Sequence, residues 1–182
     1  MDFGYLIDLI RHLDQHLSEL AQAHGAWIYA ILFAIIFAET GFVVTPFLPG
    51  DSLLFVAGAV AAAGSMNAHF LATALVIAAI LGNQLNYEIG RWIGPRVYRI
   101  EDRWYFKRRY IEQTQRFFER HGGKTITISR FVPIVRTYAP FVAGVSKMDR
   151  SRFALFNIMG GLLWVLSLVY AGYFFGNIAW VK

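Results

Sequence analysis

The apolar positions of the chain fall into two kinds of segment, long uninterrupted ones and short broken ones. Residues 68–90 contain one acidic residue, Glu88, and no basic residue, and residues 153–180 contain no charged residue at all. Because a bilayer core needs about 20 apolar residues in helical form, both segments are predicted to be transmembrane helices. The polar side chains within residues 83–86 indicate that one side of the first helix faces the protein interior.

Another apolar stretch is divided into two pieces that are each too short to cross a bilayer. Residues 26–38 and 52–64 each supply 13 uncharged residues, which is about 20 Å of helix. Between these pieces lie several prolines and glycines together with Glu39 and Asp51. Two half-length helices around such a break are typical of a re-entrant hairpin, which is tolerated where protein or water covers the backbone. We therefore predict a re-entrant hairpin over residues 26–64.

A second broken stretch follows later in the chain, over residues 125–147. It contains Arg130, Arg136 and two prolines, so it is predicted to form a second re-entrant hairpin. The two stretches share the tetrapeptide Phe-Val-Ala-Gly, at residues 55–58 and again at 141–144. In both, a charged Pro-containing break precedes the tetrapeptide and a long apolar helix follows it.

This order of elements predicts a duplicated architecture. The first unit covers about residues 1–90 and the second about residues 104–182, and each consists of an amphipathic helix, a re-entrant hairpin and a transmembrane helix. If each hairpin returns to its own side, each unit crosses the membrane once, and the two units have opposite orientations. The predicted fold is thus an all-α integral membrane protein of one membrane domain, residues 1–182, built as an inverted repeat.

Two amphipathic segments complete this interpretation. Apolar residues recur every three or four positions over residues 3–20, which predicts a helix that either lies in the membrane interface or packs on the rest of the fold. Residues 91–124 hold ten Lys and Arg against four acidic residues and are predicted to include a surface helix that ends at His121. By the positive-inside rule this segment is cytoplasmic, and its basic charge is interpreted as an orientation signal rather than a nucleic-acid site.

Composition narrows the function classes. Hydrophobic residues make up 57% of the 182 residues and charged residues 16%, against about 45–50% and about 25% in soluble domains. This excludes a disordered protein and disfavours a soluble enzyme. The absence of Cys excludes disulfides, thiolate zinc sites and cysteine nucleophiles. No His accompanies the acids inside the membrane segments, which disfavours a lipid phosphatase, and we predict no catalytic residue, metal site or cofactor.

Four charged residues lie at the predicted membrane depth of the hairpins, namely Glu39, Asp51, Arg130 and Arg136. Each costs about 2.5–3.5 kcal/mol at the centre of a membrane helix, so pairing, a polar cavity or function must offset the cost. Asp51 could instead act as the N-cap of the second half-helix, and the two arginines could extend to the cytoplasmic headgroups. Glu39 has no such local explanation.

The chemistry of these four groups favours an anionic substrate. Two carboxylates and two guanidinium groups sum to zero charge, so an empty site can neutralise itself through pairs between the two repeats. An anion that displaces a carboxylate strands negative charge in a low dielectric, and protonation of Glu39 or Asp51 removes that penalty. Arginine suits phosphate because its planar fork binds pairs of oxygens. Thr137 and Tyr138 are candidate hydroxyl partners for the phosphate. The constellation predicts a proton-coupled carrier of an anion.

The same residues carry a resemblance to a known family. The stretches ETGFVVTPFLPGDSLLFVAG at 39–58, LGNQLNYEIGR at 81–91, HGGKT at 121–125, RFVPIVRTYAPFVAG at 130–144 and NIMGGLLW at 157–164 resemble the DedA family. This family is also described as the SNARE-associated or VTT-domain superfamily. The stretches are most similar to the YqjA/YghB branch of bacterial inner-membrane members. Relatives often carry an acid where this chain has Asn83, and they usually continue into another C-terminal membrane helix.

The resemblance implies a function. The family is associated with membrane-potential-dependent or proton-dependent lipid transport, in bacteria the return of undecaprenyl phosphate across the inner membrane. It is also associated with envelope homeostasis and with resistance to cationic antimicrobial peptides. Carried over to this sequence, the acid pair is Glu39 and Asp51 and the basic pair is Arg130 and Arg136.

Three functions remain open from the sequence. The first is a proton- or potential-dependent flippase of a lipid phosphate, whose partners are an anionic lipid (undecaprenyl phosphate or a phospholipid), protons and the membrane, with no nucleic acid. The second is an energy-independent phospholipid scramblase, which would not respond to a pH gradient. The third is a structural or assembly membrane protein, in which the charges serve packing alone.

Overall fold

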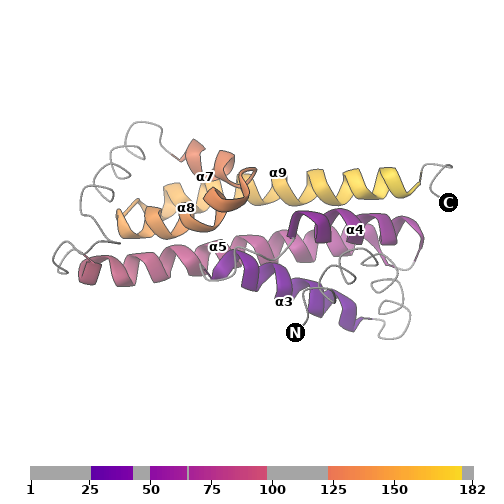
Figure 1. The fold of residues 1–182 in the computed structure, drawn as a ribbon, viewed down its shortest axis with the longest axis horizontal. Coiled ribbons are helices and arrows are strands. Elements are labelled where there is room, and N and C mark those ends of the chain that lie inside the picture. The colour runs from indigo at the N-terminus through magenta and orange to yellow at the C-terminus, as the bar shows by residue number, and fades with distance from the viewer. Residues whose placement is uncertain (1–25, 43–49, 65, 98–122, 178–182) are drawn as a thin grey trace, which may run out of the picture. The chain divides into compact units, whose positions relative to one another are not determined.

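The computed structural model describes residues 26–42, 50–64, 66–97 and 123–177, and within these ranges the chain is helical apart from short turns (Figure 1). The helices, in chain order, are α3 (Trp27–Gly41), α4 (Gly50–Ala62), α5 (Ala68–Val97), α7 (Lys124–Ser129), α8 (Pro133–Val145) and α9 (Arg150–Gly176). The predicted all-α fold is confirmed. The predicted helices over residues 3–20 and up to His121 lie outside the described residues.

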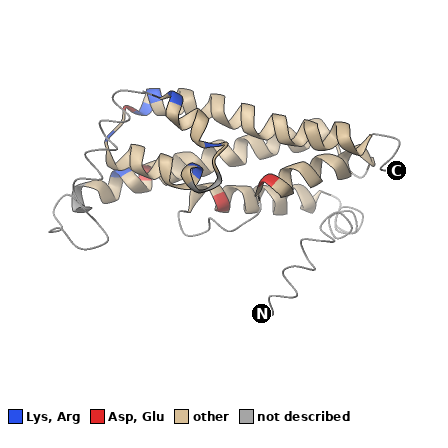
Figure 2. Ribbon diagram, turned by 45° about the horizontal axis from the view of Figure 1, so that its top comes forward, with Lys and Arg blue, Asp and Glu red and all other residues tan. Residues whose placement is uncertain are grey.

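Two of these helices have the length and composition of membrane spans. Residues Ala68–Gly94 of α5 and Arg150–Gly176 of α9 are long and apolar enough to cross a bilayer, whereas α3 and α4 are apolar but shorter. Long stretches of the described helices carry neither basic nor acidic side chains (Figure 2). These observations agree with the division into spanning and half-length helices that the hydrophobic pattern predicts.

The first long helix extends beyond the predicted membrane span. The hydrophobic pattern places that span at residues 68–90, and α5 continues into the basic segment as far as Val97. A basic residue ends the apolar stretch without ending the helix, because Arg is a good helix former. Pro95, which lacks a backbone N–H, lies two residues before Val97, the last residue of α5.

Both long helices begin with the same kind of cap. The Oδ1 atom of Asn67 accepts hydrogen bonds from the backbone N–H groups of His69 (3.1 Å) and Phe70 (3.0 Å) at the start of α5. At the start of α9, Oδ1 of Asp149 accepts from the backbone N–H of Arg152 at 3.0 Å and from the Ser151 hydroxyl. Asn and Asp are favoured N-caps because their side chains satisfy these otherwise unpaired N–H groups. The bonds to Asp149, the one from the Ser151 hydroxyl foremost, hold the pKa of that carboxyl below its usual value.

The described helices divide between two compact units. One comprises Met1–Ile35, Pro49–Val76 and Val165–Lys182, and the other comprises Ile36–Leu48 and Ile77–Trp164. We call them the α4 unit and the α8 unit, after the short helix that each contains. Helices α3, α5 and α9 each contribute a part to both units.

In the α4 unit, the first Phe-Val-Ala-Gly tetrapeptide packs directly on α9. A Cβ atom added to Gly58 would lie 2.0 Å from the carbonyl oxygen of Val169, and one added to Gly172 would lie 1.9 Å from the carbonyl oxygen of Phe55. Since real Cβ atoms do not approach backbone atoms so closely, glycine is required on both helices. Small residues of this kind let helix backbones approach in membrane proteins.

The α8 unit repeats this contact with the other tetrapeptide. A Cβ atom on Gly144 would lie 2.0 Å from the carbonyl oxygen of Tyr87, and one on Gly90 would lie 2.1 Å from that of Phe141. Each tetrapeptide therefore packs on the long helix of the other predicted repeat rather than on its own. This exchange was not predicted from the sequence. The opposite orientation of the two repeats stays a prediction.

Candidate functional site

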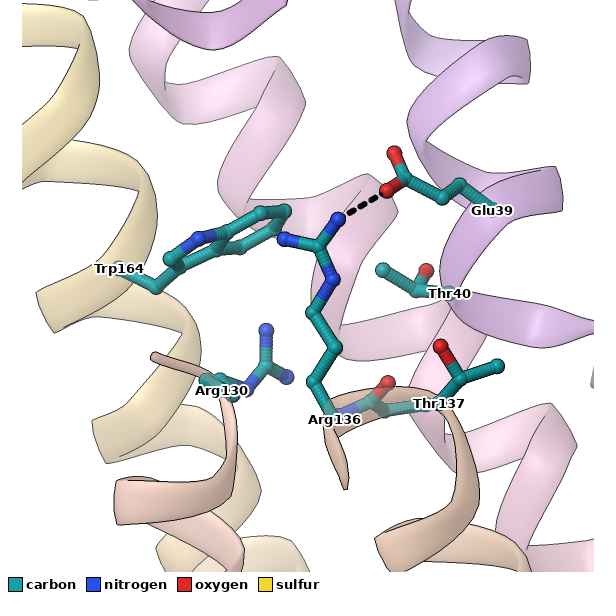
Figure 3. Close-up of a pocket in the computed structure, with 7 residues that line it drawn as sticks. Glu39, Thr40, Arg130, Arg136, Thr137 and Trp164 are labelled. Carbon is teal, nitrogen blue, oxygen red and sulfur yellow. Dashed lines mark hydrogen bonds and ion pairs between the residues drawn. The ribbon is translucent and has the colours of Figure 1, made fainter. Parts of the chain in front are cut away.

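The α8 unit contains a cavity that brings together several of the predicted site residues. Its lining side chains come from α3, α5, α8, α9 and the turn before α8: Glu39, Thr40, Asn83, Arg130, Arg136, Thr137 and Trp164 (Figure 3). The cavity encloses about 240 Å³ including its open mouth, and the space left between the side chains admits about one water molecule. It is therefore a narrow, polar site in its present state.

An ion pair between the two predicted hairpins lies at the centre of the cavity. Nη2 of Arg136, in the first turns of α8, donates to Oε1 of Glu39, near the end of α3. Both residues are buried, with 2% of Glu39 and 9% of Arg136 exposed. An acid near a helix C-terminus and a base near an N-terminus each oppose the helix dipole, so neither position is favourable alone. The pair offsets this cost and joins α3 to α8.

Arg130 is the second cation of the site, at the C-terminal end of α7. Its Nη2 donates to Oδ1 of Asn157 at 2.6 Å and, more weakly, to the carbonyl oxygens of Ala79 (3.3 Å) and Asn157 (3.4 Å). Only 2% of Arg130 is exposed. Among the residues that the structure describes, no carboxylate pairs with Arg130, and its Nε has no hydrogen-bond partner. Within the described residues, the hydrogen-bond partners of its charged group are thus neutral: an amide oxygen and backbone carbonyl oxygens.

The indole ring of Trp164 contacts both arginines. The Cζ atom of Arg136 lies 5.0 Å from the ring centroid and that of Arg130 lies 5.9 Å from it. Figure 3 shows the Arg136 guanidinium between this ring and the Glu39 carboxylate. The negative face of an aromatic ring attracts cations, so Trp164 reduces the cost of holding two like charges in one cavity. With both arginines buried, the alternative that they extend to the headgroups is wrong.

Asn86 fastens the two hairpins to each other beside the ion pair. Its Nδ2 donates to the carbonyl oxygens of Thr137 at 2.9 Å and Thr40 at 3.3 Å. Thr40 follows Glu39 and Thr137 follows Arg136, so the amide joins the chain next to each partner of the pair. Asn86 is fully buried and Asn83 nearly so, which confirms that this side of α5 faces the protein interior.

Two predicted site residues do not line the cavity. Asp51 lies in the first turn of α4 and belongs to the α4 unit. It is the second residue of that helix, not the N-cap that the sequence left open. Tyr138 is 45% exposed, whereas its neighbour Thr137 is buried and lines the cavity. The roles predicted for Asp51 and Tyr138 stay predictions.

The contribution of α9 to the site was not predicted from the sequence. The stretch 157–164 carries part of the family resemblance, but neither Asn157 nor Trp164 was assigned a role. Asn157, Gly160, Gly161 and Trp164 are spaced by three, one and three positions, which places them on one face of a helix. The sequence did contain a signal for this contribution. One face of an otherwise apolar helix carries a polar residue, two glycines and a tryptophan.

A second ion pair in the α8 unit lies away from the cavity. Arg150 donates from Nε and Nη2 to the two carboxylate oxygens of Glu88, each at 3.0 Å. Both side chains are exposed, and neither lines the cavity. Among its described residues, the unit thus shows one buried and one exposed acid–base pair, and the exposed pair provides a matched control for the buried one.

The charged residues lining the cavity are two arginines and one glutamate, a net charge of one positive. A buried charge without a counter-charge is costly, so this arrangement is suited to take up an anion. The two guanidinium groups offer several N–H donors, and Thr40 and Thr137 also line the cavity.

Comparisons with known proteins agree with a membrane protein. The VTT domain matches residues 48–174. Protein DedA of Escherichia coli K12 is 55% identical over 185 residues, covering all of this chain and 84% of the relative. An uncharacterized membrane protein of Mycobacterium leprae is 43% identical, covering 81% of this chain and 66% of the relative. Inner membrane protein YqjA of E. coli K12 is 40% identical, covering 82% of this chain and 68% of the relative. No solved structure matches.

Identity is thus higher with DedA than with YqjA, although the sequence stretches had suggested the YqjA/YghB branch. The matched domain contains α4, α5, α7, α8 and nearly all of α9, so it includes both glycine contacts and most of the cavity wall. Together with two helices of membrane-spanning length, this match shows that the chain belongs to the DedA family of membrane proteins, which carry the VTT domain.

Proposed function

We propose that the protein is a transporter, rather than an enzyme, that moves a lipid phosphate across the bacterial inner membrane as a multi-pass membrane protein. The substrate proposed is undecaprenyl phosphate, whose return across the membrane would support envelope homeostasis and resistance to cationic antimicrobial peptides. Transport would be driven by protons or by the membrane potential. The observation that carries the proposal is the buried Arg130 guanidinium, which shares a cavity with Arg136 and has no carboxylate partner among the described residues.

The donors of this arrangement suit a phosphate group. A guanidinium group presents parallel N–H donors that match pairs of phosphate oxygens, and it stays charged when buried. Arg130 has unused donor capacity at Nε, and Arg136 could be shared between Glu39 and an incoming anion. A phosphate group would replace the neutral compensation of Arg130 with a full counter-charge.

Proton coupling follows from the ion pair. A phosphate that approaches Arg136 competes with the Glu39 carboxylate for the same guanidinium. Glu39 is almost fully buried, so a displaced carboxylate would be a stranded charge in a low dielectric, and protonation is the least costly way to remove it. In this scheme Glu39 takes up a proton as the phosphate binds and releases it when Arg136 returns. Asp51 is proposed as a second proton-accepting group.

The surface beside the two arginines favours a lipid over a free phosphate ion. Large apolar side chains are exposed along the same stretch of chain: Ile128, Phe131, Val132, Val135 and Tyr138. In a membrane protein such side chains contact acyl or prenyl chains. The cavity is too narrow to enclose a whole lipid, so the headgroup would enter it after the ion pair opens while the tail stays in the bilayer.

The test is flux of a labelled undecaprenyl-phosphate analogue into liposomes that contain the purified protein, with and without a pH gradient. We expect gradient-dependent flux that is lost in Glu39→Gln and Arg136→Ala. The matched controls are Glu88→Gln and Arg150→Ala, which make the same chemical changes in the exposed pair and should retain flux. Loss of flux in the controls as well would point to folding rather than to the cavity.

The other functions predict different results in the same experiment. Equal flux with and without a pH gradient, and with and without a membrane potential, would identify an energy-independent scramblase and contradict the coupling. No flux from folded wild-type protein would favour a structural or assembly role. Flux of inorganic phosphate equal to that of the lipid would contradict the lipid substrate.

A further inference from the structure

One face of α9 holds Arg130 in place. Asn157, Gly160, Gly161 and Trp164 lie on this face, and each meets the arginine in a different way. Asn157 accepts a hydrogen bond from the guanidinium, and the Trp164 ring lies near its Cζ atom. We call these four residues the α9 cradle.

The two glycines of the cradle leave room for the side chain of Arg130. A Cβ atom on Gly160 would lie 3.0 Å from Cδ and 3.1 Å from Nε of Arg130. A Cβ atom on Gly161 would lie 3.6 Å from Nη2 of Arg130 and 2.9 Å from the Ile80 side chain. Arg130 therefore lies flat against α9, with its position fixed by shape as well as by hydrogen bonds.

The amide of Asn157 has a defined orientation. Its Nδ2 donates to the carbonyl oxygen of Ile80 at 3.0 Å, which leaves Oδ1 to accept from Nη2 of Arg130 at 2.6 Å. An aspartate has nearly the same shape and could still accept from Arg130. It would, however, neutralise the guanidinium, and in its ionised form it could not donate to Ile80. Asn157 thus orients the Arg130 guanidinium through a hydrogen bond and does not neutralise its charge.

We infer that Asn157 is a positioning residue whose neutrality keeps the charge of Arg130 available for the phosphate group of the substrate. This inference rests on the proposed function and deepens it, because it gives each of the two arginines a separate role. Arg136 has a carboxylate partner and serves the coupling step, whereas Arg130 has an amide partner and serves as the standing anion site. Charge at position 157 then sets whether the cavity binds an anion.

The test compares two substitutions whose order separates charge from structure. Asn157→Asp keeps the shape and the acceptor, and Asn157→Ser keeps neutrality but loses reach. In the liposome assay, KM and kcat for the labelled lipid phosphate are measured for both, with thermal stability measured on the same preparations. We expect Asn157→Asp to raise KM by about tenfold or more, since a charge-assisted contact to the substrate is lost. Asn157→Ser should raise KM less, although it changes the shape more. Asn177→Asp changes an exposed asparagine just after α9 that does not line the cavity; it adds the same charge and should leave KM unchanged.

The opposite order would overturn the inference. If Asn157 only supports the fold, Asn157→Asp is the milder change in both KM and stability, and Asn157→Ser is the more damaging one. If Asn157→Asp does not fold, Asn157→Ser still tests the inference. A folded serine variant is neutral at position 157, so its failure to transport the lipid phosphate would show that neutrality there is not sufficient and would contradict the inference. A wild-type protein that shows no lipid-phosphate flux overturns the proposed function itself, whereas wild-type flux with the reversed order overturns this inference only.

Discussion

The α4 unit and the α8 unit contain the same helix contact but different chemistry. In both, a Phe-Val-Ala-Gly tetrapeptide meets a long helix through glycine, with Gly58 and Gly172 in one unit and Gly144 and Gly90 in the other. The third contact of each is also equivalent, because a Cβ atom on Gly176 would meet Ala59 in the α4 unit and one on Gly94 would meet Val145 in the α8 unit, at 2.9 and 3.2 Å. The same contacts between glycine and the facing backbone thus recur in both units.

The side chains around this contact are not repeated. Aligned on their glycines, α5 carries Asn83 and Asn86 where α9 carries Val165 and Leu168. The contact in the α4 unit forms with the apolar pair, so buried asparagines are not needed to pack the tetrapeptide against a long helix. Buried polar groups are costly unless they are satisfied. Among the described residues, buried polar side chains occur in the α8 unit alone, and the cavity there explains the asparagines better than the fold does.

The largest effect is expected from substituting the glycine that ends the tetrapeptide in each unit. Gly58→Ala and Gly144→Ala each place a Cβ atom 2.0 Å from a carbonyl oxygen, and the facing backbone cannot move aside without separating the helices. Overpacking of this severity exceeds the usual cost of about 1–3 kcal/mol, so we expect both variants to lose folded protein in detergent, as measured by size-exclusion chromatography and thermal unfolding.

Gly41→Ala is the matched control for the glycines, because its Cβ would find the nearest atoms at an ordinary 3.5 Å. It should leave the elution profile unchanged. A folded Gly144→Ala protein beside an unfolded Gly58→Ala protein would break the equivalence of the two contacts.

The next effect distinguishes the buried ion pair of the α8 unit from its exposed pair. Arg136→Met leaves the Glu39 carboxylate buried without its guanidinium partner, and breaking a buried pair in this way costs about 3–5 kcal/mol. We expect a large fall in thermal midpoint for Arg136→Met and a partial recovery in the double variant with Glu39→Gln. Arg150→Met, in the exposed pair, should leave the midpoint nearly unchanged.

The recovery is the informative part of this experiment. A double variant as stable as the wild type, yet without flux, would show that the pair is kept for transport and not for stability. A double variant no more stable than Arg136→Met would instead indicate that Arg136 contributes through packing on Trp164.

A smaller loss of stability is expected when Asn86 of the α8 unit is replaced by leucine, the residue at the matching position of the α4 unit. Asn86→Leu gives α5 the apolar side chain that α9 has at the matching position, and removes the hydrogen bonds to the carbonyl groups of Thr40 and Thr137. Net hydrogen-bond contributions of about 0.5–1.5 kcal/mol each predict a modest loss of stability. The loss of flux should be larger in proportion, because the hairpins are no longer joined beside the ion pair.

Leu168→Asn is the reciprocal change in the α4 unit. It introduces an amide into an apolar contact, at a position that does not line the cavity, so we expect it to lower stability without affecting KM. Equal effects of both substitutions on KM would contradict a special role for Asn86.

The spacing of the elements was easier to predict from the sequence than their packing partners. Hydrophobic length placed the two spans and the half-length helices close to their observed positions, because burial in a bilayer depends on runs of apolar residues. The cost of buried charge pointed to Glu39, Arg130 and Arg136 from residue type and position alone. The glycine contacts between repeats and the approach of Asn157 to Arg130 could not be predicted, because both depend on which helices pack together. Periodicity identifies the face of a helix but not its partner.

The smallest effect concerns the caps, where the two long helices differ by one titratable group. Asn67 and Asp149 occupy equivalent positions and accept equivalent backbone hydrogen bonds. Asn67→Ala should cost about 1 kcal/mol at any pH, and Asp149→Ala should be destabilising at neutral pH. The pKa of Asp149 is lowered from its usual value of 3.8, so the stability it contributes is complete above that value and is lost as the pH falls through the pKa of the folded state.

Thermal midpoints of the wild type and both alanine variants, measured in detergent at pH 7 and at about pH 3, test this difference between the caps. The gap between the wild type and Asp149→Ala should narrow at the lower pH, whereas the gap between the wild type and Asn67→Ala should stay constant. The constant gap also controls for any general effect of acid on the helices. A gap for Asp149→Ala that does not change with pH would mean that α9 is capped by shape and hydrogen bonding alone, as α5 is, and that the carboxylate charge adds nothing at this end of the helix.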